Sequence, residues 1–130
     1  MGAIEKHILE IEKQMVGAFN QGKVEEILKF FDNEIIGFSS TRHERLMGLE
    51  ALRQTFLYYL KDSESVEYSI TSPLIKSMSD NCAVITFYWL VVMTSGRKRR
   101  EIHGRGTHLF HKKENEWKIV HEHFSRTHHG

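Results

Sequence analysis

The chain has 130 residues, enough for one domain, and its apolar content of 40% and charged content of 27% are those of ordinary soluble globular proteins. Its 18 Lys and Arg residues nearly balance 17 Asp and Glu residues, which excludes a global attraction to nucleic acid or to a membrane surface. One cysteine excludes an internal disulfide framework, and no apolar run or leader-like amino end points to a membrane span or to export, so we expect one cytoplasmic domain over residues 1–130.

The first half of the sequence has helical periodicity. Apolar residues recur at spacings of three and four from Ile4 to Phe19, which predicts a helix over residues 3–20 with Glu12 largely off its apolar stripe. A short second helix is predicted over Val24–Phe31, and a third over residues 49–60.

The second half has the alternation and the β-branched and aromatic residues that are typical of strands. The predicted strands are Glu34–Ser39, Val66–Met78 with an end or a bulge at Pro73, Cys82–Thr94, Arg100–Lys112 and Trp117–Arg126. Because helices precede a run of strands, the pattern favours an α+β fold over alternating βαβ units.

The last two strands form a predicted hairpin. A three-residue loop ending at Asn115 pairs His108 with Val120 and Gly106 with Glu122. A slip of one residue in this loop would realign the two strand faces. In the predicted register one face carries Gly106, His108, Phe110, Val120, Glu122 and Phe124. The other carries Arg105, Thr107, Leu109, Ile119, His121, His123 and Ser125.

The carboxy-terminal stretch, Gly104–Thr107 with Trp117–Ser125, and the segment Gly48–Arg53 carry a family resemblance. The chain resembles the nuclear transport factor 2-like superfamily, in the SnoaL-like (polyketide-cyclase-like) branch that includes the association domain of calcium/calmodulin-dependent protein kinase. The resemblance implies a cone-shaped α+β fold in which N-terminal helices pack on a strongly curved, mainly antiparallel sheet. It also implies a pocket inside the cone and a homodimer formed through the outer face of the sheet.

The resemblance also indicates which side chains face the pocket. In the kinase association domain, arginines project into it from the last three strands, at positions that match Phe87, His108 and Phe124 here. None is arginine in this chain, so that carboxylate-binding cluster is not reproduced. The matching positions place Trp89 and Glu122 on the pocket side as well.

Glu122 and His108 are the candidate catalytic residues. A carboxylate among aromatic rings is poorly solvated, which suits it to proton transfer, and His108 on the same face could share or orient its proton. The alternative is a structural Glu122 that accepts hydrogen bonds from Arg105 or Arg53 and holds strands together.

The candidate ligand-binding residues are mostly aromatic, and we expect them to line a cavity of roughly a few hundred cubic ångströms. They are Phe38, Phe56, Tyr59, Phe87, Trp89 and Phe124, with Arg105 added if the register slips. Their alternative role is ordinary core packing.

Two further motifs favour simpler interpretations. His121 and His123 lie on one strand face and could form a metal pair, but they fit equally at a dimer face, and we expect no metal or cofactor. The basic run Arg97–Arg100 follows a predicted turn, which favours a solvated hairpin tip, and we expect no nucleic-acid partner.

The sequence therefore predicts a small-molecule-binding domain whose ligand is apolar or carbonyl-containing. An isomerase, cyclase or dehydratase of the ketosteroid-isomerase-like or polyketide-cyclase-like kind, with Glu122 as general acid/base, is the first alternative. A dimeric assembly module without a ligand is the second, and no membrane partner is expected.

Overall fold

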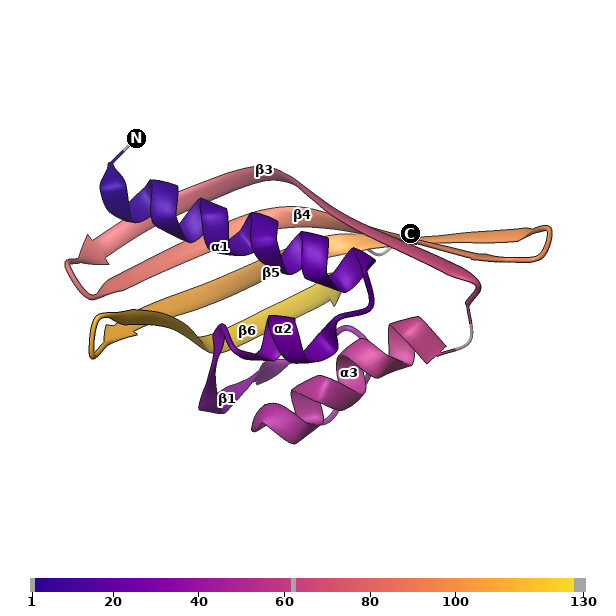
Figure 1. Ribbon diagram of the computed structural model, residues 1–130, viewed down its shortest axis with the longest axis horizontal. Coiled ribbons are helices and arrows are strands. Elements are labelled where there is room, and N and C mark those ends of the chain that lie inside the picture. Colours follow the sequence, from indigo (N-terminus) through magenta and orange to yellow (C-terminus); the bar gives the residue numbers. More distant parts are fainter. Residues whose placement is uncertain (1, 62, 128–130) are drawn as a thin grey trace.

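The computed structural model describes residues 2–61 and 63–127 (Figure 1). The helices are α1 (Ala3–Asn20), α2 (Val24–Leu28) and α3 (Leu49–Lys61). The strands are β1 (Phe31–Phe38), β2 (Leu46–Met47), β3 (Ser65–Ser79), β4 (Cys82–Ser95), β5 (Lys98–Lys113) and β6 (Glu116–Arg126). The helices lie on one face of the sheet, with α1 across β3 and β4 and α3 beside β1 and β2 (Figure 1).

The sheet is open and mixed. Its six strands follow the order β2-β1-β6-β5-β4-β3, and every neighbouring pair is antiparallel except β1 and β6, which are parallel. The predicted α+β class, with N-terminal helices on a mainly antiparallel sheet, is confirmed.

The second helix is shorter than predicted. It ends at Leu28 rather than Phe31, which instead begins β1 opposite Ile119. The chain changes conformation here because the carbonyl of Phe30 accepts a hydrogen bond from the Ile119 amide at 2.9 Å, which ties the segment to β6. The strand β2 was not predicted, since two residues carry no recognisable period.

The predicted register of the last hairpin was wrong. The turn has two residues, Glu114 and Asn115, both with positive φ (54° and 65°), as a type I′ turn requires. A bulge between Leu109 and Phe110 shifts the pairing further, so that His108 faces Glu122 rather than Val120. Glu122 therefore lies directly across the ladder from His108.

The bulge also changes which side chains enter the core. Ile119 is fully buried, whereas Val120, which the sequence placed on the inner face, is only half-buried. A bulge places two residues of one strand opposite one of its partner, so the inward alternation resumes one residue later. Glu122 and Phe124 consequently share the inner face with Ile119.

Helix α1 packs its apolar stripe on the sheet, with Ile8, Met15 and Phe19 buried. The prediction that Glu12 lies off this stripe was wrong, because its side chain is buried with 2% exposure. Within the described residues, no helix is long and apolar enough to cross a membrane.

Candidate functional site

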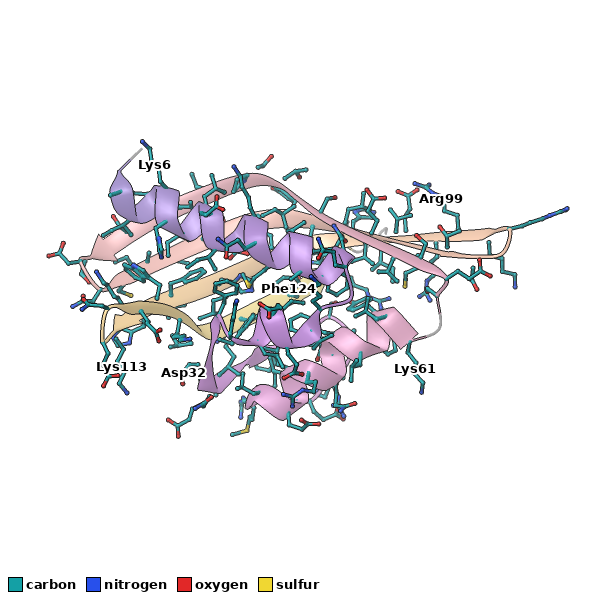
Figure 2. The ribbon with its side chains drawn as sticks, viewed as in Figure 1. Lys6, Asp32, Lys61, Arg99, Lys113 and Phe124 are labelled. Carbon is teal, nitrogen blue, oxygen red and sulfur yellow. The ribbon has the colours of Figure 1, made fainter. Side chains whose placement is uncertain are left out.

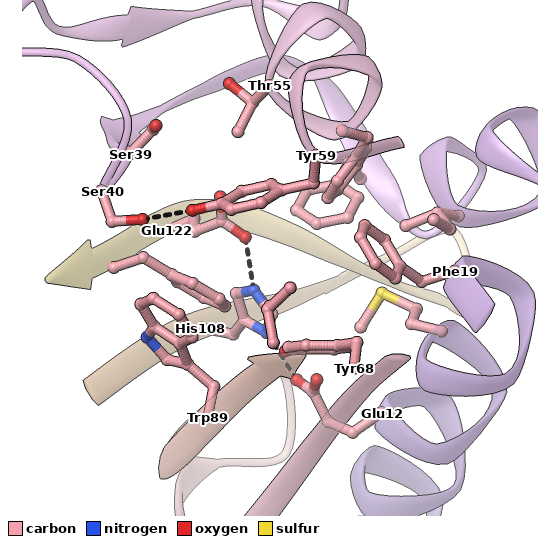
Figure 3. Close-up of a pocket in the computed structure, with 16 residues that line it drawn as sticks. Glu12, Phe19, Ser39, Ser40, Thr55, Tyr59, Tyr68, Trp89, His108 and Glu122 are labelled. Carbon is pink, nitrogen blue, oxygen red and sulfur yellow. Dashed lines mark hydrogen bonds and ion pairs between the residues drawn. The ribbon is translucent and has the colours of Figure 1, made fainter. Parts of the chain in front are cut away.

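A cavity lies between the helices and the inner face of the sheet (Figure 3). Its volume is about 60 Å³, counted as the space open to the centres of water-sized molecules, and it is smaller than the sequence led us to expect. Aromatic side chains make up much of its lining. The lining comprises Glu12, Met15, Phe19, Ile27, Phe31, Ser39, Ser40, Thr55, Phe56, Tyr59, Tyr68, Trp89, Val91, His108, Glu122 and Phe124.

Three ionisable side chains form a buried chain of hydrogen bonds in the cavity wall. The His108 Nδ1 atom lies 2.6 Å from Oε2 of Glu12, and its Nε2 atom lies 2.7 Å from Oε1 of Glu122 (Figure 3). Their exposures are 2% for Glu12, 3% for His108 and 4% for Glu122. We call these three residues the carboxylate–imidazole trio.

The charge of the trio follows from its hydrogen bonds. Each of the two bonds needs one proton between its atoms, and a neutral imidazole supplies only one N–H. The two protons are therefore carried either by an imidazolium between two carboxylates, or by an imidazole and one protonated carboxyl. In both distributions the trio has one net negative charge.

The environment of His108 favours the imidazolium. Burial by itself lowers the pKa of His108, but the charges and hydrogen bonds of Glu12 and Glu122 outweigh burial and raise this pKa from 6.5 to about 10. A positively charged ring near neutral pH lets both ring nitrogens donate, one to each carboxylate. The trio is consequently an ion cluster inside an apolar cavity.

Two tyrosines complete the polar part of the lining. The Tyr59 hydroxyl lies 2.8 Å from the Ser40 hydroxyl, and burial raises the pKa of Tyr59 although this hydrogen bond lowers it (Figure 3). Burial and the charges of Glu12 and Glu122 raise the pKa of Tyr68 well above its usual value. The Tyr68 phenol is therefore a neutral hydroxyl close to the trio.

Aromatic rings surround His108. The Phe124 ring stacks on Trp89 with a centroid distance of 5.7 Å and lies 5.6 Å from the His108 ring. The Trp89 indole N–H is covered by protein atoms and makes no hydrogen bond within the described part of the chain. It is not positioned to donate to a molecule in the cavity.

The structure brings together most of the side chains singled out from the sequence. His108, Glu122, Phe56, Tyr59, Trp89 and Phe124 line the cavity. Phe87 is buried on the same face but lies behind the lining, with its ring 5.4 Å from that of His108.

Two other candidates, Phe38 and Arg105, point to the opposite face of the sheet and do not line the cavity either. Phe38 contacts His123 there, at a ring separation of 5.3 Å. Arg105 is exposed and lies across the ladder from Tyr88. The proposed arginine partners of Glu122 are absent as well: Arg53 pairs with Glu25 and Glu50 on the surface.

Sequence reasoning missed Glu12 and Tyr68. Glu12 follows Ile8 by one helical turn and precedes Met15 by three residues, so a wider stripe would have included it. Tyr68 stands between Val66 and Ile70 in the alternating pattern of β3, and only the packing of α1 shows that its hydroxyl approaches the trio.

The remaining motifs lie away from the cavity. His123 is on the outer face of the sheet, and no group of three or more His, Cys, Asp or Glu residues within residues 2–61 and 63–127 could hold a metal ion. The basic run Arg97–Arg100 occupies the tip of the β4–β5 hairpin, where Arg99 pairs with Glu101 (Figure 2).

Comparison with known families decides the classification, because residues 8–128 match the model of the SnoaL-like domain. The chain belongs to the SnoaL-like domain family. This family lies within the nuclear transport factor 2-like superfamily that the sequence resembles, and the match spans nearly the whole chain.

Solved structures share this SnoaL-like fold. A putative calcium/calmodulin-dependent protein kinase II association domain from Xanthomonas campestris has a TM-score of 0.81 at 16% identity, over 93% of this chain and 86% of that one. A putative scytalone dehydratase from Novosphingobium aromaticivorans has a TM-score of 0.81 at 14% identity, over 96% and 85%. The association domain of the C. elegans kinase has a TM-score of 0.78 at 17% identity, over 95% of both chains.

Proposed function

We propose that this SnoaL-like domain binds a small molecule in the cavity between its helices and its sheet. The observation that carries the proposal is a hollow with aromatic walls and a buried polar trio at one side. Ligand sites typically combine apolar walls with a few convergent polar groups. A volume of about 60 Å³ favours a small ligand over a drug-sized one.

Filling the cavity tests this proposal. Thr55 lines the cavity from α3, whereas its neighbour Gln54 is exposed. We expect butanone to raise the melting temperature of the wild type and of Gln54→Leu but not of Thr55→Leu, whose larger side chain occupies the hollow. Equal shifts in all three proteins would contradict binding in this cavity.

We further propose proton transfer next to a carbonyl group as a second candidate function, of the isomerase, cyclase or dehydratase kind. The specific support is the trio, in which Glu122 faces the cavity and connects through His108 to Glu12. A carboxylate linked to a second acceptor can take up a proton and pass it on.

Deuterium exchange tests this second candidate without knowledge of the substrate. We expect the protein in D₂O to accelerate exchange at the carbons beside the carbonyl of butanone, as followed by proton NMR. Glu122→Gln should abolish the acceleration, and Glu10→Gln, on the exposed side of α1, should retain it. Exchange no faster than in buffer would exclude this reaction for the probe.

We also propose that two copies associate through the outer face of the sheet. This face exposes large apolar side chains, Ile36 at 48%, Leu74 at 72% and Tyr88 at 57%. Exposed apolar groups of this kind are typical of interaction surfaces. The likeness to kinase association domains supports assembly as a use of the fold.

A further inference from the structure

The trio and its aromatic surroundings point to the charge of the ligand. We propose that the cavity selects a small cationic amine, whose ammonium group lies against the two carboxylates and whose carbon skeleton packs on the rings. This inference deepens the proposed binding function and rests on it.

The net charge of the trio favours a cationic ligand. The trio has one net negative charge, because three groups share two protons, and its members are at most 4% exposed. A buried charge is costly unless it is compensated. None of the residues that line the cavity in the described chain is Lys or Arg. Arg126 lowers the pKa of the Tyr59 hydroxyl through its charge and a hydrogen bond. The Arg126 side chain is exposed, however, so water and salt screen its charge from the cavity.

The two carboxylates of the trio each have an oxygen that His108 does not use. Each carboxylate uses one oxygen for His108, Oε2 in Glu12 and Oε1 in Glu122. The other oxygen of each carboxylate makes no hydrogen bond within the described residues, and neither is completely covered by protein atoms. Both oxygens can therefore accept an N–H from a molecule in the cavity. A carbonyl or a carboxylate ligand offers no such donor.

The aromatic walls of the cavity also favour a cation. Seven aromatic side chains contribute to the lining: Phe19, Phe31, Phe56, Tyr59, Tyr68, Trp89 and Phe124. Ring faces attract cations, and the attraction is strongest where water is excluded. An anion gains no such attraction from a ring face, so the rings favour a cation as the trio does.

The cavity volume sets the size of the amine. One water needs roughly 10–15 Å³ of cavity volume, measured in the same way as for this cavity. A volume of about 60 Å³ thus accommodates a few non-hydrogen atoms, as in a short branched alkylamine.

Three probes with one carbon skeleton test the inference: isobutylammonium, isobutanol and isobutyrate. Each is titrated into the ¹⁵N-labelled protein near neutral pH, and affinity is read from the amide shifts of cavity residues. We expect isobutylammonium to bind about tenfold more tightly than isobutanol, and isobutyrate to bind most weakly.

Matched variants locate the source of the preference. Glu122→Gln removes one charge of the trio on β6, and Glu12→Gln removes one on α1. If one variant does not fold, the other still provides the test. Either should reduce the tenfold preference to less than threefold, while the affinity for isobutanol changes little. Glu10→Gln makes the same charge change on the exposed side of α1 and should keep the full preference.

The outcomes separate this inference from the proposed function. If isobutanol binds in the cavity as tightly as isobutylammonium, selection of amines is refuted while binding of a small molecule stands. If no probe shifts the cavity residues, both proposals are overturned. A preference that Glu10→Gln weakens as much as Glu122→Gln would also overturn the inference, because its source would then be the general charge of the protein.

Discussion

At the scale of single residues, His108 is held by two carboxylates that come from different elements. Its ring donates to Glu12 on α1 and to Glu122 on β6, at 2.6 and 2.7 Å. Removing one partner of such a buried cluster leaves a charge without compensation, which is more destabilising than the cluster itself is stabilising. The trio therefore ties α1 to the sheet and fixes the polar side of the cavity.

The raised pKa of His108 predicts how stability depends on pH. The folded protein binds this proton up to about pH 10, whereas the unfolded chain releases it near 6.5. The stabilisation is therefore fully present below pH 6.5 and is lost as the pH rises through about 10. We expect the free energy of unfolding by urea to fall over this range, with a slope of up to about 1.4 kcal/mol per pH unit.

His108→Gln is the control for this prediction, since it should be less stable near neutral pH and should lack the additional slope. Direct NMR titration of the His108 ring provides a second check that needs no unfolding. Glu12→Gln should lower the pKa of His108, and Glu10→Gln should leave it unchanged. A ring that titrates near 6.5 in the wild type would refute the ion cluster.

Residues differ in how far the sequence could predict them. Glu122 and His108 were singled out because alternation on a strand places both on one face, whichever of the two registers holds, and the family resemblance indicates that this face lines the pocket. Glu12 was not, because a charged residue beside an apolar helical stripe is usually solvated, and only a partner distant in sequence makes its burial favourable. The partner of a buried charge is a property of tertiary structure.

At the scale of elements, the β5–β6 hairpin carries the site. Its short turn and its bulge together move Glu122 by two residues along the ladder relative to the predicted pairing, yet both residues remain on the same face. A shift of two residues preserves the alternation of a strand, whereas a shift of one reverses it. This is why the facing residues could be predicted although the register was wrong.

Gly106 provides an element-scale prediction. A Cβ atom at this position would lie 2.7 Å from Cε2 of Phe87 and 2.9 Å from Cε1 of Phe124, so both rings would have to move. We expect Gly106→Ala to reduce the free energy of unfolding by roughly 1–3 kcal/mol. The measurement is the midpoint of unfolding in urea.

Gly17→Ala is the matched control on α1, where the added Cβ would meet nothing within 4 Å apart from its chain neighbours and the adjacent helix backbone. Because glycine weakens a helix, this change should raise stability by roughly 0.5–1 kcal/mol. Equal effects of the two substitutions would show that packing under the rings is not what requires glycine at Gly106.

At the scale of the whole molecule, the two faces of the sheet have different surroundings. The inner face is covered by helices and forms the core, whereas the outer face is uncovered and exposes Ile36, Leu74 and Tyr88. The fold could be predicted because the period of each long element and the family resemblance agree. The cavity volume could not, because it depends on how the aromatic rings fill the interior.

The uncovered face predicts an association that mutation can weaken. We expect light scattering to give twice the chain mass of 15.3 kDa at micromolar concentrations, and Tyr88→Lys to shift the protein towards monomers. Leu57→Lys, on the exposed side of α3, should leave the dimer intact. A wild-type protein that remains monomeric would contradict this assembly.

The order in which the trio is connected has a consequence for synthesis on the ribosome. Glu12 is made early, but its partner His108 follows 96 residues later, and Glu122 another 14 after that. Until β5 and β6 have left the exit tunnel, the nascent helix α1 cannot bury its carboxylate against an imidazolium. The trio therefore forms among the last steps of folding in the cell, whereas the apolar side of α1 can pack on β3 and β4 as soon as those strands have been made.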